Sequence, residues 1–195
     1  MRFLPLLTGS IFCELLQHGR KTESAIKSHD THLLTHFTPA LERYFSQQPG
    51  KFPQLNALSV ATLLPLFLIA FAFNLLHFLH ALPGLSPPLH ALSFFVPSLI
   101  MIAALLTTSA LLARGFTMGL TGFLSLFLLL LALTVLQGLH QLLAGTGRGW
   151  PLAIAAFALL GCRILFNSRG FVLFTIYCRT QRLSAVMRKM RLKSH

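Results

Sequence analysis

The stretch LSVATLLPLFLIAFAFNLLHFLHAL, residues 58–82, is apolar throughout and contains no charged side chain. About 20 consecutive apolar residues are needed to cross the hydrocarbon core of a bilayer, so this run predicts a transmembrane helix. Residues 90–113 and 116–144 are equally apolar and long enough to span. Residues 150–166 would reach only roughly 25 Å as a helix, but Arg163 can extend to one interface and Trp150 can anchor the other.

The segments between these four runs are short. Residues 83–89 are rich in Pro and Gly, Arg114 and Gly115 form a tight turn, and residues 145–149 are rich in Gly. Short connections force neighbouring helices to run antiparallel. The predicted fold is therefore an all-α membrane protein, an up-down bundle of four transmembrane helices over residues 58–166.

The flanking segments differ from the bundle in composition. Residues 1–57 are predicted to be a cytoplasmic or interfacial amphipathic helical segment. In this segment, residues 3–16 are too short an apolar run to span, and a signal peptide is the competing interpretation. Residues 22–48 resemble two amphipathic helices divided at Pro39. Residues 167–195 form a basic tail that is predicted to lie at the membrane surface.

Acidic residues are confined to the start of the chain. Hydrophobic residues make up 54% of the sequence and charged ones only 10%, whereas soluble domains carry about 25% charged residues. The four acids are Glu14, Glu23, Asp30 and Glu42, and no carboxylate follows. This absence excludes an intramembrane carboxylate proton relay, a carboxylate base in the spans and zinc hydrolysis of the HExxH type. We therefore expect a protein that is not an enzyme.

The net charge of +12 comes mainly from cations that flank the apolar runs. This placement favours anionic lipid as the partner over nucleic acid, which is not expected to bind. Six cations of the tail are predicted to contact lipid headgroups: Arg179, Arg182, Arg188, Lys189, Arg191 and Lys193.

Lys and Arg near the spans predict the orientation. If four helices cross, Arg43, Lys51, Arg114 and the basic tail share one side, whereas Arg148 lies on the other. The expected location is therefore the inner membrane of a cell, with both termini in the cytoplasm.

Four histidines lie near the ends of the predicted spans that face away from the cytoplasm: His77, His80, His90 and His140. Neutral imidazoles bind zinc, copper and haem iron, and a site at a bundle mouth would need rings from different helices. The alternative is that these rings are interfacial polar caps. No resident cofactor is expected, with haem or a transition metal as the open possibility.

Gly115 and Gly119 form a GxxxG pattern at the start of the third run, and Gly122 follows one turn later. Small residues allow two helix backbones to approach closely, so this is a predicted helix-packing face. Its partner is either the same bundle or another protein, and the sequence leaves both open.

These observations favour a non-enzymatic multi-pass membrane protein that acts through protein–protein contacts in the membrane. A regulator, an assembly factor and an immunity or exclusion protein all fit this description, and the partner is another membrane protein or a second copy. The first alternative is a haem- or metal-binding redox protein that uses the outer histidines. The second is a small transporter or pore, for which the polar Asn74 supplies little of a path.

Overall fold

The computed structural model is all-helical and describes residues 7–28, 52–80, 84, 86–144 and 149–193. The side chains of 25, 27, 52–57, 144 and 187–193 lie outside this description. Six helices make up the described part: α2 (Ser10–Lys27), α4 (Phe52–His80), α5 (Pro87–Ala113), α6 (Thr117–Ala144), α7 (Trp150–Phe166) and α8 (Arg169–Lys193). The predicted all-α class is confirmed.

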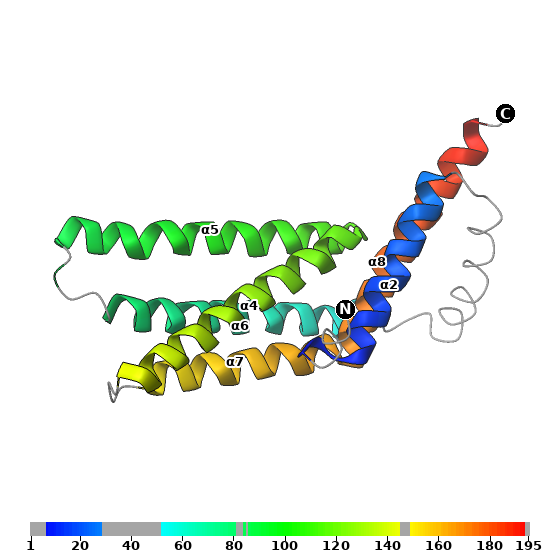
Figure 1. Cartoon of the computed structure of the whole chain (residues 1–195). Helices are drawn as coiled ribbons and strands as arrows, with labels where there is room; N and C mark the ends of the chain where they lie inside the picture. Colours follow the sequence, from blue (N-terminus) through cyan, green and yellow to red (C-terminus); the bar gives the residue numbers. More distant parts are fainter. Residues whose placement is uncertain (1–6, 29–51, 81–83, 85, 145–148, 194–195) are drawn as a thin grey trace.

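Helices α4 to α7 run alternately up and down beside one another (Figure 1). Helix α4 packs against α5, α6 and α7, while α5 packs on α6 and α6 on α7. Three helices are long and apolar enough to cross a membrane: Leu58–His80, Pro87–Ala113 and Thr117–Leu143. A fourth span results if α7 and the first part of α8, which meet at 56°, count as one broken span. The described part therefore has three to four candidate spans, which indicates a multi-pass membrane protein.

The ends of the long helices follow local signals. The predicted run 150–166 coincides with α7, which begins with Trp150 and Pro151 after Gly149. Helix α5 begins three residues earlier than the predicted 90–113, because Ser86 is extended and a proline at the first turn needs no hydrogen-bonded N–H. Helix α4 begins at Phe52, before the apolar run starts, and α6 begins at Thr117.

Helix α2 corrects the expected organisation of the N-terminal segment. It runs without a break from Ser10 to Lys27 and so joins parts of the two predicted segments, 3–16 and 22–48. Its Phe12, Leu15 and Leu16 are buried in the protein core, so tertiary packing extends the helix through Gly19. The second predicted amphipathic helix, beyond Pro39, lies outside the described residues.

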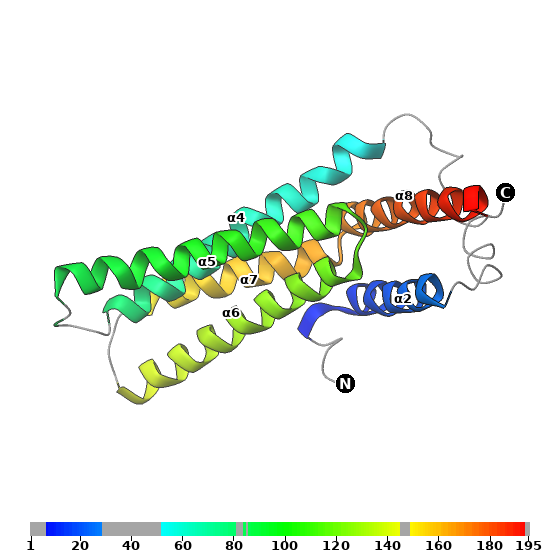
Figure 2. The ribbon, with the colours of Figure 1, turned by 90° about the horizontal axis from the view of Figure 1, so that it is seen from above.

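Helices α2 and α8 extend in the same direction from the end of the bundle at which α5 turns into α6 (Figure 2). Phe166 anchors the bend between α7 and α8. Its fully buried ring lies 4.6 Å from the ring centroid of Phe12, 5.7 Å from that of Phe127 and 5.6 Å from that of Phe171. Aromatic pairs at these separations attract one another beyond their burial. One ring at the end of α7 thus ties together α2, α6 and α8.

A polar pair joins α4 to α6 inside the bundle. Asn74 is 2% exposed, and its Nδ2 donates to Thr134 Oγ1 at 2.9 Å and to the Ala70 carbonyl at 2.8 Å. The Gln137 side chain donates to the Asn74 carbonyl at 3.2 Å. Buried polar groups are stabilised only when they are hydrogen-bonded, so this pair fixes how α4 and α6 face each other.

Candidate functional site at the junction of α2, α6 and α8

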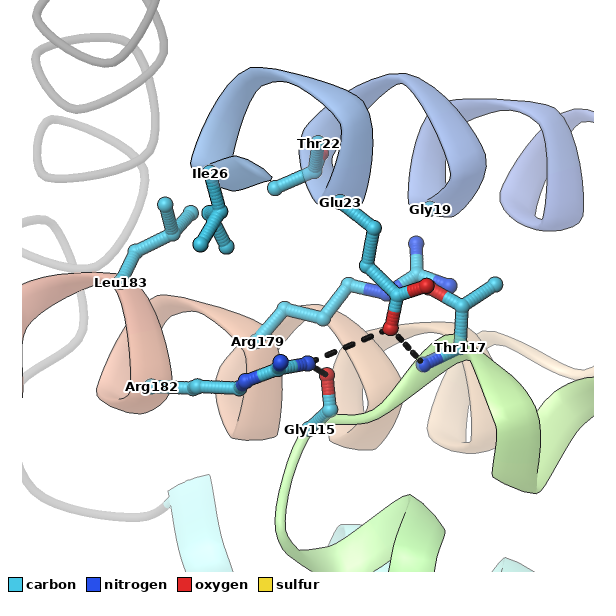
Figure 3. Close-up of a pocket in the computed structure, with 9 residues that line it drawn as sticks. All are labelled: Gly19, Thr22, Glu23, Ile26, Gly115, Thr117, Arg179, Arg182 and Leu183. Carbon is cyan, nitrogen blue, oxygen red and sulfur yellow. Dashed lines mark hydrogen bonds and ion pairs between the residues drawn. The ribbon is translucent and has the colours of Figure 1, made fainter. Parts of the chain in front are cut away.

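Glu23 of α2 reaches the start of α6. One carboxylate oxygen, Oε1, accepts a hydrogen bond from the Thr117 backbone N–H at 2.9 Å and pairs with Arg182 Nη1 of α8 at 3.3 Å (Figure 3). The first N–H groups of a helix have no partner within the helix, and the helix dipole favours a negative charge there. Glu23 therefore caps α6 from another helix and binds α8 with the same oxygen.

Arg182 completes this contact by fixing the turn between α5 and α6. Its Nη1 lies 3.3 Å from the Gly115 carbonyl, and its guanidinium carbon lies 3.7 Å from the centre of the Phe116 ring. A cation over an aromatic face is attracted by the negative face of the ring. The Arg182 side chain is only 23% exposed, so this guanidinium is held by the fold on several sides.

Arg179, one turn before Arg182 on α8, is the most deeply buried cation among the described residues, at 6% exposure. Its Nη1 donates to the Leu15 carbonyl of α2 at 2.8 Å, and its buried Nη2 has no hydrogen-bond partner in the described part of the chain. A Cβ at Gly19 would overlap this guanidinium. Glycine at position 19 is therefore what lets Arg179 lie against α2.

The turn between α5 and α6 presses on α8. Gly115 has a φ of +75°, a conformation that side-chain-bearing residues rarely adopt, and a Cβ there would overlap the Cys178 carbonyl. Both requirements select glycine at this position. The turn, α2 and α8 therefore meet as one closely packed junction.

The junction has little free space. The cavity between Glu23, Thr117, Arg179 and Arg182 has a volume of about 10 Å³, which is about the size of one water molecule. A substrate does not fit there. The charged groups of the junction thus attach α2 and α8 firmly to the bundle.

His18 of α2 lies near Arg179 of the junction. Burial lowers the pKa of His18 below 6.5, and the nearby positive charges of Arg179 and Lys21 lower it further. A lowered pKa makes the neutral imidazole the predominant form at pH 7. His18 therefore adds no third positive charge to the two arginines at neutral pH.

The predicted outer-face histidines are only partly brought together. His77 is half-buried near the end of α4 and lies within electrostatic range of His80 and His140, both exposed. His80 Nδ1 lies 2.7 Å from the Leu76 carbonyl of its own helix, and His90 is exposed near the start of α5. Among the residues that the structure describes, no three His, Cys, Asp or Glu side chains are grouped to hold a metal ion. Metal or haem binding stays a prediction.

The predicted glycine face is used within the chain. A Cβ at Gly119 would overlap the Leu112 backbone of α5, and one at Gly122 would overlap the Thr108 side chain. Gly115, as shown above, packs its turn on α8. Of the two partners that the sequence left open, the structure shows the same chain in contact with all three glycines, through α5 for Gly119 and Gly122 and through α8 for Gly115.

Two of the six cations predicted to contact lipid have contacts inside the fold. Arg179 and Arg182 form the junction, and their guanidinium groups are directed at α2 and the α5–α6 turn. The other four, Arg188, Lys189, Arg191 and Lys193, lie on the last turns of α8 with side chains outside the described residues. The prediction of lipid contact therefore applies to these four.

Glu23, Thr117 and Gly19 were not singled out from the sequence. Thr117 lies 94 residues from Glu23 in the chain, and periodicity carries no information about contacts at such separations. One signal was present, because four acids among sixteen Lys or Arg residues give each acid many oppositely charged groups that attract it. Nothing in the sequence indicates which of these cations pairs with which acid.

In comparisons with models of protein families, with curated proteins and with solved structures, nothing matches the chain. The class of the protein is therefore stated from its fold. Residues 7–28, 52–80, 84, 86–144 and 149–193 are all-helical, with three to four long apolar helices that could span a membrane.

Proposed function

We propose that this chain is a non-enzymatic multi-pass membrane protein that binds a transmembrane helix of another membrane protein, as a regulator, an assembly factor or an immunity or exclusion protein. The observation that supports this proposal most is the outer face of α5, by which we mean the side of this helix that points away from the other helices of the bundle. Only 11% of the most apolar 18-residue stretch of α5 is buried inside the molecule, whereas 33% of the corresponding stretch is buried in each of the other two candidate spans. One span of the bundle thus has most of its surface free of intramolecular contacts.

The outer face of α5 has the surface shape that is typical of a helix-packing interface. Its buried residues Met101, Leu105 and Leu112 lie on one stripe. The opposite stripe alternates large and small exposed side chains, namely Leu99, Ala103, Leu106 and Ala110. Small residues between large ones form holes into which side chains of a second helix fit, and close backbone approach drives helix association in lipid.

The junction of α2, α6 and α8 also supports the proposal of a non-enzymatic protein that binds a partner. Its charged groups are engaged with one another and with backbone atoms, and its cavity of about 10 Å³ admits no substrate. Rigid attachment of α2 and α8 to the bundle is what a protein needs when it presents a fixed surface to a partner.

We also propose the inner membrane as location, with both termini in the cytoplasm. The support is the bias of Lys and Arg toward the side of the α5–α6 turn and of α8. Reporter fusions are expected to place residue 195 and the N-terminus on the cytoplasmic side and residue 84 on the opposite side. A C-terminus on the outer side would mean that α7 and α8 do not complete a fourth span.

Site-specific photo-crosslinking in native membranes tests the proposed partner helix. A photoreactive phenylalanine derivative replacing Ala103 or Ala110 is expected to yield one discrete protein adduct, because these positions lie at the centre of the proposed contact. Phe157 of α7 provides the matched control. It is 73% exposed on another face of the bundle, and the same probe there is expected to react with lipid alone.

Three outcomes would contradict the proposal. Lipid adducts alone from α5 would show that its outer face lies in the bilayer without a partner. An equal yield of protein adducts from the probe at position 157 would show that the probe reacts with membrane proteins that it meets at random. An adduct formed only between two differently tagged copies of this chain would replace the foreign partner by self-association.

A further inference from the structure

A cleft opens on the side of the bundle between α6 and α7. Its volume is about 350 Å³. Apolar side chains from the two helices form most of the lining: Phe127, Leu131, Val135, Ala156, Leu159 and Leu160. Phe127 and Leu159 are buried and make the floor, while Val135 and Leu160 are half exposed at the rim. The cleft is therefore an apolar groove that is open toward the hydrocarbon of a surrounding bilayer.

A second, more polar hollow continues from one end of this cleft. It has a volume of about 840 Å³ and is bordered by Gly9 and Ser10 before and at the start of α2, and by Asn167 and Ser168 after α7. Leu160 and Arg163 line both hollows. One continuous depression thus passes from apolar walls to polar walls, and Arg163 stands at the change.

The polar end is held in place by hydrogen bonds. Asn167 Nδ2 donates to the Thr8 carbonyl at 2.7 Å and to the Arg163 carbonyl at 2.9 Å. Gly9 has a φ of +95°, and a Cβ there would overlap the Asn167 side chain. These contacts fix the chain at Thr8 and Gly9 beside Arg163, so the depression is built by the fold.

Arg163 is exposed, and among the described residues the only ion pair is the one between Arg182 and Glu23. No carboxylate follows Glu42 in the sequence, so helices α4 to α8 supply no acid for it. Guanidinium groups bind phosphate oxygens in a two-pronged geometry, and basic pockets between transmembrane helices bind lipid headgroups. The charge of this depression is thus complementary to an anion whose remaining part is apolar.

We propose that this depression binds one anionic phospholipid, with its phosphate on Arg163 and one acyl chain in the cleft between α6 and α7. The combination of apolar walls and one exposed guanidinium supports a lipid as the occupant, because a phospholipid joins an anionic phosphate to an apolar acyl chain. A lipid site of this kind is separate from the outer face of α5 and does not depend on the proposed protein partner.

Native mass spectrometry of the full-length protein in neutral detergent, with phosphatidylglycerol added, tests the site. Wild type is expected to retain one phosphatidylglycerol, and Arg163→Gln to bind it about tenfold more weakly, as expected for loss of a charge-assisted hydrogen bond. Ala156→Trp fills the cleft and is expected to reduce retention similarly. Thermal unfolding of each variant establishes that it is folded before binding is compared.

Matched controls use neighbouring positions outside the depression. Arg169→Gln removes an exposed cation at the start of α8, and Ala153→Trp adds the same bulk to an exposed position of α7. Both are expected to retain the lipid as wild type does.

Several results would overturn the proposal. The first is unchanged retention by Arg163→Gln and Ala156→Trp, and the second is equal loss in the two controls. The third is equal binding of zwitterionic phosphatidylcholine by wild type, which would show that charge is not recognised. The fourth is displacement by inorganic phosphate together with full retention by Ala156→Trp, which would indicate a small-anion site without an acyl chain.

Discussion

Replacing Gly119 by alanine is expected to lower the free energy of unfolding by about 1–3 kcal/mol, the range for overpacked positions. The reason is steric. The added methyl group would meet the backbone of α5 at Leu112 and the Thr108 carbonyl, and a backbone yields less readily than the end of a flexible side chain. Helices α5 and α6 would have to separate, and this contact is the most extensive one that α5 makes. Unfolding in detergent, followed by circular dichroism, measures the effect.

Gly138 gives the matched control on the same helix. A Cβ at Gly138 would meet nothing within 4 Å. Alanine there restricts the unfolded chain without a clash and is expected to raise stability by about 0.4–1 kcal/mol. Opposite signs for the two alanine variants would support the close α5–α6 contact. A stabilising effect at Gly119 equal to that at Gly138 would show that the two helices do not approach each other there.

The long helices were predictable from the sequence because their signals are local. Apolar runs give the spans, and Gly149 followed by Trp150 and Pro151 gives the start of α7. The helix-packing role of Gly119 and Gly122 was also predictable, since only small residues permit such approach. The helix that these two glycines face was not predictable, because it depends on how all the helices of the bundle pack together.

The junction could not be predicted for a related reason. Periodicity and composition describe each segment by itself, whereas Glu23, Thr117 and Arg182 come from three segments that meet only after folding. Arg179 and Arg182 resembled the other cations of a basic tail, and lipid was the expected contact for all of them. One turn separates the two along α8, so both project from the same side of the helix toward α2.

A double-mutant cycle on Glu23 and Arg182 addresses the junction directly. Glu23→Gln keeps the shape of the side chain and removes its charge, so the capping of α6 and the ion pair both weaken. The side chains of Arg182 and Glu23 are 23% and 27% exposed, so the expected loss is about 1–2 kcal/mol, below the range for fully buried pairs. Arg182→Gln is expected to cost a similar amount, and the two losses should couple by at least about 0.5 kcal/mol.

Glu14→Gln is the control for this cycle, since Glu14 is an exposed acid on the same helix. An exposed substitution of this kind changes stability by about 0.5 kcal/mol or less. Hydrogen exchange adds a structural readout, because loss of the Glu23 contacts should speed exchange of the Thr117 N–H, which has no partner within α6. Additive losses for Glu23→Gln and Arg182→Gln, together with unchanged exchange at Thr117, would mean that α2 is held on the bundle by its apolar residues alone.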